Sequence, residues 1–122
     1  AGWRGLADGV LESTLQALDC PAAEITVWLG PAIGPEAFEV GTEVKAAFTS
    51  KLAAAEQAFR PSPNADRWLA DLYLLARQRL MQSGVRAISG GDFCTYKEKA
   101  RFFSYRREGT TGRMASLIWL EQ

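Results

Sequence analysis

The feature that most constrains the fold is a change in the spacing of apolar residues between positions 5 and 29. In the first part apolar residues recur every three or four positions, as at Leu6, Val10 and Leu18, which predicts a helix over residues 5–18. Residues 25–29 (ITVWL) form a continuous β-branched and aromatic run that Gly-Pro ends, as is typical of a short buried strand. The helical spacing and the strand-like run together predict a domain of mixed α and β class.

Two further helices are predicted in the middle of the chain. Thr42 is a candidate N-cap for a helix whose apolar stripe runs from Val44 to Phe59. A Pro-rich turn follows, and Asn64 is a candidate cap for a third helix over residues 65–83.

Three more strands are predicted in the last third. Residues 85–88 read as one strand, and residues 102–105 and 114–120 as two strands joined by a turn around Gly109 and Gly112. We therefore expect an α+β fold, with a mixed or antiparallel sheet flanked by helices.

Composition restricts the partners. Lys plus Arg is 14 and Asp plus Glu is 14, so the net charge is zero, which argues against bulk electrostatic binding to nucleic acid or an anionic membrane. Cys20 and Cys94 lack metal-ligand spacing, and two lone cysteines favour a cytoplasmic location. The chain contains no His, so a Ser-His-Asp triad, a Cys-His dyad and a typical zinc site cannot be built from this chain alone.

Basic residues gather near the glycine-containing turn of the last third. Arg106, Arg107 and Arg113 flank this turn, where guanidinium groups can hold phosphate or carboxylate with paired hydrogen bonds. The alternative is a solvated hairpin with ordinary surface charges, and the pattern alone favours it.

Two other residues stand in glycine-containing contexts. Cys94 follows Gly-Gly-Asp-Phe, where it is either a nucleophile or metal ligand, or a small apolar residue that fills a gap. Arg4 lies between Trp3 and Gly5 just before the first helix, where it either serves a bound anion or points into solvent.

Six segments, taken in order, resemble the C-terminal half of the laccase-domain family, also called the YfiH or peptidoglycan editing factor family. The segments are AGWRGLADGVLE, LGPAIGPEAFEVG, ADLYLLARQRL, GGDFCTY, RFFSYRR and TGRMASLIWL. The resemblance implies that residues 1–122 are the C-terminal part of a single laccase domain, half of a YfiH-like α/β sandwich, whose N-terminal half is absent.

The resemblance also implies a Zn or Cu site in the intact protein, held by two His and one Cys. In the family these ligands come before the residue that matches Ala1, so we expect no metal ligand in this chain. Arg4, Arg106, Arg113 and Cys94 match family motifs and are the candidate substrate-binding residues, with Arg113 and Arg106 as the first candidates for phosphate. No catalytic residue is assigned.

The activities that the resemblance implies fall into several classes. The first is a metal-dependent purine nucleoside phosphorylase acting on adenosine, inosine or methylthioadenosine, with adenosine deamination as a further activity. The alternatives are a copper-dependent polyphenol oxidase, a cysteine hydrolase acting on peptidoglycan precursors, and an inactive half-domain that needs its N-terminal partner. The expected partners are a purine nucleoside, phosphate and the missing half, and we expect the isolated chain to be inactive.

Overall fold

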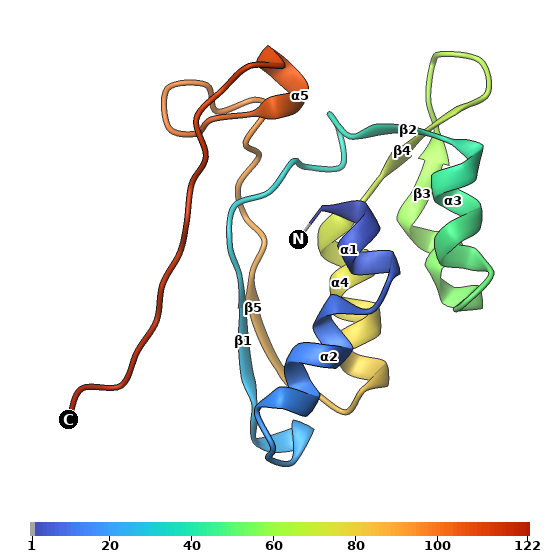
Figure 1. Ribbon diagram of the computed structural model, residues 1–122. Coiled ribbons are helices and arrows are strands. Elements are labelled where there is room, and N and C mark those ends of the chain that lie inside the picture. Colours follow the sequence, from blue (N-terminus) through green and yellow to red (C-terminus); the bar gives the residue numbers. More distant parts are fainter. Residues whose placement is uncertain (1) are drawn as a thin grey trace.

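The computed structural model describes residues 2–122 and contains two small sheets with helices packed against them (Figure 1). In the first sheet β1 and β5 run parallel, with Thr26 opposite Ala87 and Leu29 opposite Gly90. The second sheet is antiparallel, in the order β2-β4-β3. The elements are α1 (Trp3–Ala7), α2 (Val10–Ala17), η1 (Ala22–Glu24), β1 (Thr26–Leu29), β2 (Glu39–Gly41), α3 (Thr42–Thr49), η2 (Ala53–Ala58), β3 (Phe59–Pro61), β4 (Arg67–Ala70), α4 (Leu72–Gln82), β5 (Ala87–Gly90) and α5 (Tyr105–Glu108).

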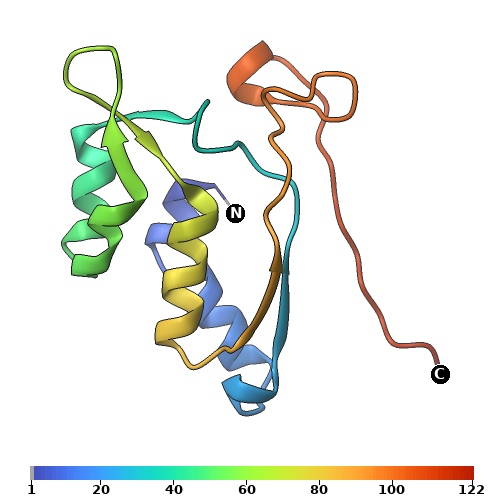
Figure 2. The ribbon, with the colours of Figure 1, turned by 180° about the vertical axis from the view of Figure 1, so that it is seen from behind.

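The α+β class with a mixed set of strands and flanking helices is confirmed. Helices α2 and α4 lie on one side of the β1–β5 sheet, and both views in Figures 1 and 2 show the sheet between these helices and the C-terminal end of the chain. The core lies where α1, α3 and α4 meet the second sheet, and Phe48, Ala70 and Leu75 are almost fully buried there. Within residues 2–122 no helix combines the length and the apolar character that a membrane crossing requires.

The helix predicted over residues 5–18 is two helices. Gly9 has φ +98°, a left-handed conformation that ends α1 and precedes α2. Glycine adopts this conformation without the steric cost that a Cβ imposes, so the chain turns between the two segments.

The second and third predicted helices begin and end at other residues than expected. The N-cap of α3 is Gly41 rather than the predicted Thr42. Phe59, predicted on the same helix, lies in β3, where the centre of its ring is 6.2 Å from the centre of the Phe48 ring. The prediction of a helix from residue 65 is wrong, because residues 67–70 form the central strand β4. The N-cap of α4 is Asp71, whose carboxylate accepts a hydrogen bond from the Leu74 N–H at 2.9 Å.

The structure differs most from the prediction in the last third of the chain. The strand expected at 85–88 is confirmed as β5, shifted by two residues. The strands expected at 102–105 and 114–120 are absent. Ser104 instead caps the short helix α5, and residues 111–122, here called the C-terminal tail, have no helix or strand.

Candidate functional site

The candidate site lies where the two parallel strands end. The chain leaves β1 into the loop at residues 30–35 and leaves β5 into the loop at residues 91–95. Ala32 and Cys94 form a parallel bridge between these loops, and the Thr95 N–H donates to the Ala32 carbonyl at 3.0 Å. The carboxyl ends of parallel strands are where α/β proteins place ligand sites.

Tyr73 on α4 holds the two loops together. Its hydroxyl accepts from the Ala32 N–H at 2.7 Å and donates to the Phe93 carbonyl at 2.7 Å. The side chain is buried, and this burial raises the pKa of the phenol above its ordinary value of 10.0, so the hydroxyl stays a neutral donor. The sequence pattern does not indicate this role, because Tyr73 falls on the apolar stripe of its helix.

A pocket of about 330 Å³, here called the Arg106 pocket, opens beside these loops. Its wall combines residues from three parts of the chain, among them Trp3, Ile33, Phe38, Phe103, Tyr105 and Arg106. The Arg106 guanidinium lies 5.0 Å from the centre of the Phe38 ring and donates to the Glu39 carbonyl at 2.6 Å. A fixed positive group beside an aromatic wall suits a ligand with both an anionic and a planar part.

The Glu39 side chain stays ionised at the edge of this region. Hydrogen bonds from Ser62 and from Asn64, the latter at 2.7 Å, hold the pKa of the carboxyl below its ordinary value of 4.5. The carboxylate is therefore occupied by the loop between β3 and β4, and Arg106 binds the backbone of Glu39 rather than its side chain.

Arg106 and its neighbour Arg107 have different environments. Arg107 is largely buried and donates to the carbonyls of Thr95 (2.7 Å), Tyr96 (2.9 Å) and Phe102 (2.8 Å). It fixes the loop that carries the pocket wall. Arg106 is exposed and lines the pocket.

The structure places the other two predicted arginines against aromatic residues of the same pocket. The Arg4 guanidinium lies 4.7 Å from the Trp3 ring, and the Arg113 guanidinium lies 5.4 Å from the Tyr105 ring. Both arginines are exposed, and neither lines the pocket itself. Each of the three arginines thus lies against one aromatic residue of the pocket wall, while their role in substrate binding stays a prediction.

Cys94 lines a separate hollow of about 340 Å³, together with Gly34, Tyr73 and Glu98. The Cys94 thiol accepts a hydrogen bond from the Gly34 N–H at 3.2 Å. The backbone N–H of Cys94 donates to the Glu98 carboxylate at 2.7 Å. A Cβ at position 34 would lie 3.2 Å from the Cys94 Cβ, a tight contact, so glycine there eases the close approach of the loops. The structure does not bring Cys94 into the Arg106 pocket.

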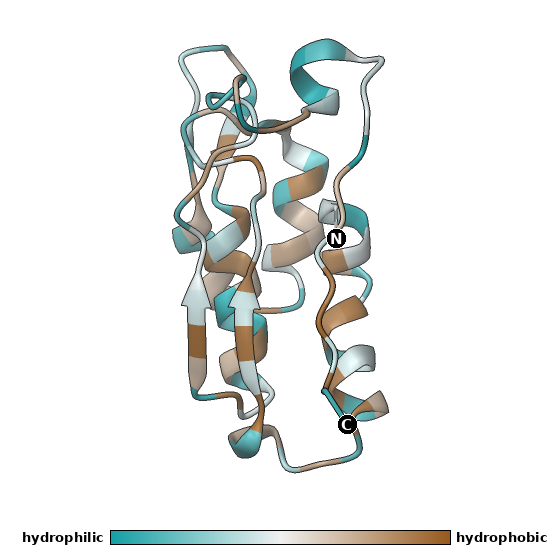
Figure 3. Cartoon of the chain, turned by 90° about the vertical axis from the view of Figure 1, so that its left-hand side faces the viewer, coloured by the Kyte–Doolittle hydropathy of each residue, from teal (hydrophilic) through white to brown (hydrophobic). Residues whose placement is uncertain are grey.

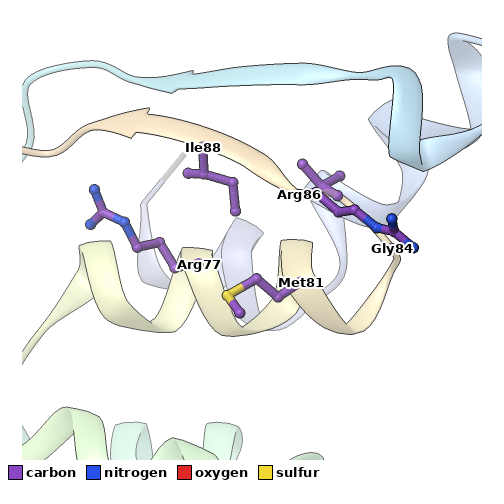
Figure 4. A pocket seen from close by; sticks show the side chains of 6 residues that line it. Arg77, Met81, Gly84, Arg86 and Ile88 are labelled. Carbon is purple, nitrogen blue, oxygen red and sulfur yellow. The ribbon is translucent and has the colours of Figure 1, made fainter.

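A further hollow, of about 560 Å³, lies between α4 and β5 (Figure 4). Arg77 and Arg86 lie at its two ends, with Met81 and Ile88 between them. The Arg77 guanidinium already donates to the Gly90 carbonyl at 2.6 Å. None of the predicted site residues lines this hollow.

The donor residues of the chain do not fit the Zn or Cu ion that the resemblance implies. The sequence has no His, and residues 2–122 contain no group of three or more Cys, Asp and Glu placed to hold a metal ion. We therefore derive no step of a reaction through a metal held by this chain.

The sequence matches, over residues 1–121, the family described as multi-copper polyphenol oxidoreductase laccase. The chain belongs to this laccase family. The family membership predicted from the six segments is thereby confirmed.

Curated members of the laccase family are close in sequence. The chain is 60% identical, over 99% of its length, to the purine nucleoside phosphorylase PA4543 of Pseudomonas aeruginosa, of which it covers 50%. It is 58% identical, over 98% of its length, to the purine nucleoside phosphorylase YfiH of Escherichia coli, of which it covers 49%. The chain spans about half the length of the curated relatives it matches.

Solved structures agree with this family assignment. The crystal structure of the Neisseria meningitidis protein NMB0706 superposes with a TM-score of 0.95 at 51% identity, over all of this chain and 50% of the other. The structure of YlmD from Geobacillus stearothermophilus gives a TM-score of 0.79 at 31% identity, over 88% of this chain and 42% of the other.

Proposed function

We propose that this laccase-family chain contributes the Arg106 pocket to a purine nucleoside phosphorylase. The single observation that carries the proposal is the geometry of that pocket, in which the Arg106 guanidinium lies 5.0 Å from the centre of the Phe38 ring. The remaining aromatic residues of its wall are Trp3, Phe103 and Tyr105. The names of the relatives at 58–60% identity support it.

The proposed reaction requires the two substrates to be held side by side. A phosphate oxygen forms a bond to the anomeric carbon of the sugar while the glycosidic C–N bond breaks. The electron pair leaves with the purine, which takes up a proton, and the products are the free base and the sugar 1-phosphate. Positioning the phosphate lowers the barrier because it replaces an encounter in solution. Arg106 has the charge and the fork geometry for that task.

The aromatic wall has the complementary task. Faces of aromatic side chains stack on planar bases, and the exposed rings of Phe103 and Tyr105 are available at the pocket. We propose adenosine, inosine and methylthioadenosine as substrates, with adenosine deamination as a further activity. We propose further that a Zn or Cu ion belongs to the half of the domain outside this chain, whose residues would hold it.

A copper-dependent polyphenol oxidase is the second candidate, because the matching family is described as a multi-copper polyphenol oxidoreductase laccase. The two candidates differ in their co-substrates. A phosphorylase requires phosphate, whereas a phenol oxidase requires an oxidant and no phosphate.

The decisive experiment replaces the matching half of the Pseudomonas aeruginosa relative with residues 1–122, which gives a full-length chimera. We expect the purified chimera to release adenine from adenosine only when phosphate is present. Activity on a phenol with no release of adenine would contradict the phosphorylase assignment and favour the oxidase.

Arg106→Ala in this chimera tests the assigned pocket. Loss of a charged hydrogen-bonding partner of phosphate should lower kcat/KM for phosphate about 10- to 100-fold. Arg86→Ala is the matched control, because Arg86 lines the separate hollow between α4 and β5. This variant should leave kcat/KM for phosphate unchanged. An unchanged kcat/KM in Arg106→Ala would show that the phosphate site lies elsewhere.

A further inference from the structure

The buried polar side chains of this chain gather at one place. Besides Tyr73, two polar residues are buried among residues 2–122, Thr95 at 8% and Ser104 at 6% exposure, and both line the Arg106 pocket. A hydroxyl taken out of water costs free energy unless it finds a hydrogen-bond partner, so buried polar groups are normally paired inside the protein. The partners of these two hydroxyls therefore bear on what the pocket binds.

Ser104 has a partner inside the chain. Its Oγ accepts from the Arg107 N–H at 3.3 Å and so caps the short helix α5. The burial of this hydroxyl is explained by the structure that it stabilises.

Thr95 differs from Ser104, because its backbone is fixed while its hydroxyl is free. The Thr95 N–H donates to the Ala32 carbonyl at 3.0 Å, and the Thr95 carbonyl accepts from the Arg107 guanidinium at 2.7 Å. The hydroxyl makes no hydrogen bond among residues 2–122, yet it is not one of the unpaired polar atoms there that are closed to solvent. Since Thr95 is buried and lines the pocket, its hydroxyl is reached through the pocket.

The surroundings of this hydroxyl make its free hydrogen-bonding capacity significant. Phe38, Leu72 and Phe103 belong to the pocket wall, and so does Met114 of the C-terminal tail, whose hydrophobic segments are brown in Figure 3. A hydrogen bond in apolar surroundings is stronger than one in water, and a polar group left unpaired there is costly. A fixed hydroxyl kept unpaired in such a wall favours a ligand that supplies the missing partner.

We propose that Thr95 is a phosphate-binding residue, whose hydroxyl donates a hydrogen bond to an oxygen of the phosphate substrate. This inference rests on the proposed phosphorylase function and adds a second residue to its phosphate site. Thr95 and Arg106 line the same pocket, and Arg107, the chain neighbour of Arg106, binds the Thr95 carbonyl. Phosphate offers several acceptor oxygens, so it takes hydrogen bonds from a guanidinium and a hydroxyl at once.

Thr95→Val in the full-length chimera tests this assignment, because valine keeps the shape of the side chain and removes the hydroxyl. We expect KM for phosphate to rise about 10-fold and KM for adenosine to stay unchanged, since one hydrogen bond to a charged ligand is lost. The melting temperature should not fall, because no hydrogen bond inside the chain is lost. Thr95→Ser, which keeps a hydroxyl, should restore most of the affinity for phosphate.

Two control variants separate this role from a structural one. Thr49→Val makes the same chemical change on α3, where the Thr49 hydroxyl donates to the Lys45 carbonyl at 3.0 Å, and it should leave both KM values unchanged. Ser104→Ala removes the cap of α5 and should lower the melting temperature by about 2–4 °C. A similar fall in Thr95→Val with no change in KM for phosphate would overturn the proposal.

The other outcomes also decide. A rise in KM for adenosine alone would overturn the proposal, since the hydroxyl would then hold the nucleoside, and unchanged values for both substrates would overturn it too. If the unaltered chimera releases no adenine in the presence of phosphate, the proposed function fails by itself. Calorimetric titration of the chimera with inorganic phosphate then tests Thr95 separately. Binding about 10-fold weaker in Thr95→Val supports the site, whereas equal binding, or none to the unaltered chimera, overturns it.

Discussion

Leucine has opposite environments in two regions of this chain. Leu75 and Leu80 on α4 are each 1% exposed, whereas Leu117 and Leu120 in the tail are 80% and 93% exposed. Helix α4 meets α2, the η2 turn and the second sheet, so its apolar side chains find partners inside the chain. Leu117 and Leu120 stay uncovered among residues 2–122. The comparison teaches that stability of the chain resides in the body around α4, to which the exposed leucines of the tail contribute little.

The strongest test of this difference in stability truncates one leucine in each region. Leu75→Ala should lower the free energy of unfolding by about 2–5 kcal/mol, because it leaves a cavity in packed core. Leu120→Ala should change it by less than about 0.5 kcal/mol. Urea unfolding followed by circular dichroism measures both, and similar losses for the two variants would contradict the division into body and tail.

A smaller effect is expected at the junction between the body and the candidate site. Tyr73→Phe removes the hydroxyl that joins the loops after β1 and β5, and leaves the Ala32 N–H and the Phe93 carbonyl without this partner. We expect a loss of about 1–3 kcal/mol in the same unfolding experiment. Tyr96→Phe is the control, since Tyr96 is exposed, and a loss as large as that of Tyr73→Phe would refute a specific bridging role.

The smallest expected effect depends on pH. Arg79 on α4 donates to the Glu12 carboxylate of α2 at 2.6 and 3.1 Å, and this bond holds the pKa of Glu12 below its ordinary value of 4.5. The lowered pKa stabilises the fold above about pH 4.5, and this contribution disappears as the pH falls through the lower pKa of the folded state. Glu12→Gln should therefore cost about 0.2–1 kcal/mol at pH 7, because the pair is partly exposed.

The pH series itself is the check on that assignment. The difference in unfolding free energy between Glu12→Gln and the unaltered chain should shrink as the pH falls below 4.5. Glu24→Gln, at an exposed position away from this ion pair, is the matched control. A difference that stays constant between pH 7 and pH 3 would mean that the ion pair does not cause it.

The sequence predicted the helical body better than the strands around it. The apolar spacing from Leu72 to Leu80 correctly places the inner face of α4, because helix periodicity is local. Strand β4 was missed, since Trp68 and Leu69 extend the helical pattern backwards, while their actual partners lie on β2, far away in sequence, and on β3, across the turn at residues 62–66. The propensities of neighbouring residues carry no information about which strands pair.

The same limit applies to the end of the chain and to the site. Residues 114–120 have a strand composition, yet they pair with nothing among residues 2–122, because a strand needs a neighbour as well as a propensity. The sequence placed Arg106 and Arg113 near a turn, but it could not separate Arg106 from the largely buried Arg107. Only the fold shows that Arg107 binds three carbonyls and that Tyr73 joins two loops.

The most direct test of the central claim is amide hydrogen exchange over residues 114–120, measured in the 122-residue chain and in the chimera, with residues 72–82 of α4 as the internal reference. We predict that the tail amides exchange as unprotected backbone in the 122-residue chain and become strongly protected in the chimera, while α4 is protected in both. Tail amides that exchange equally fast in both proteins would contradict the expectation that the exposed tail packs against the other half of the domain.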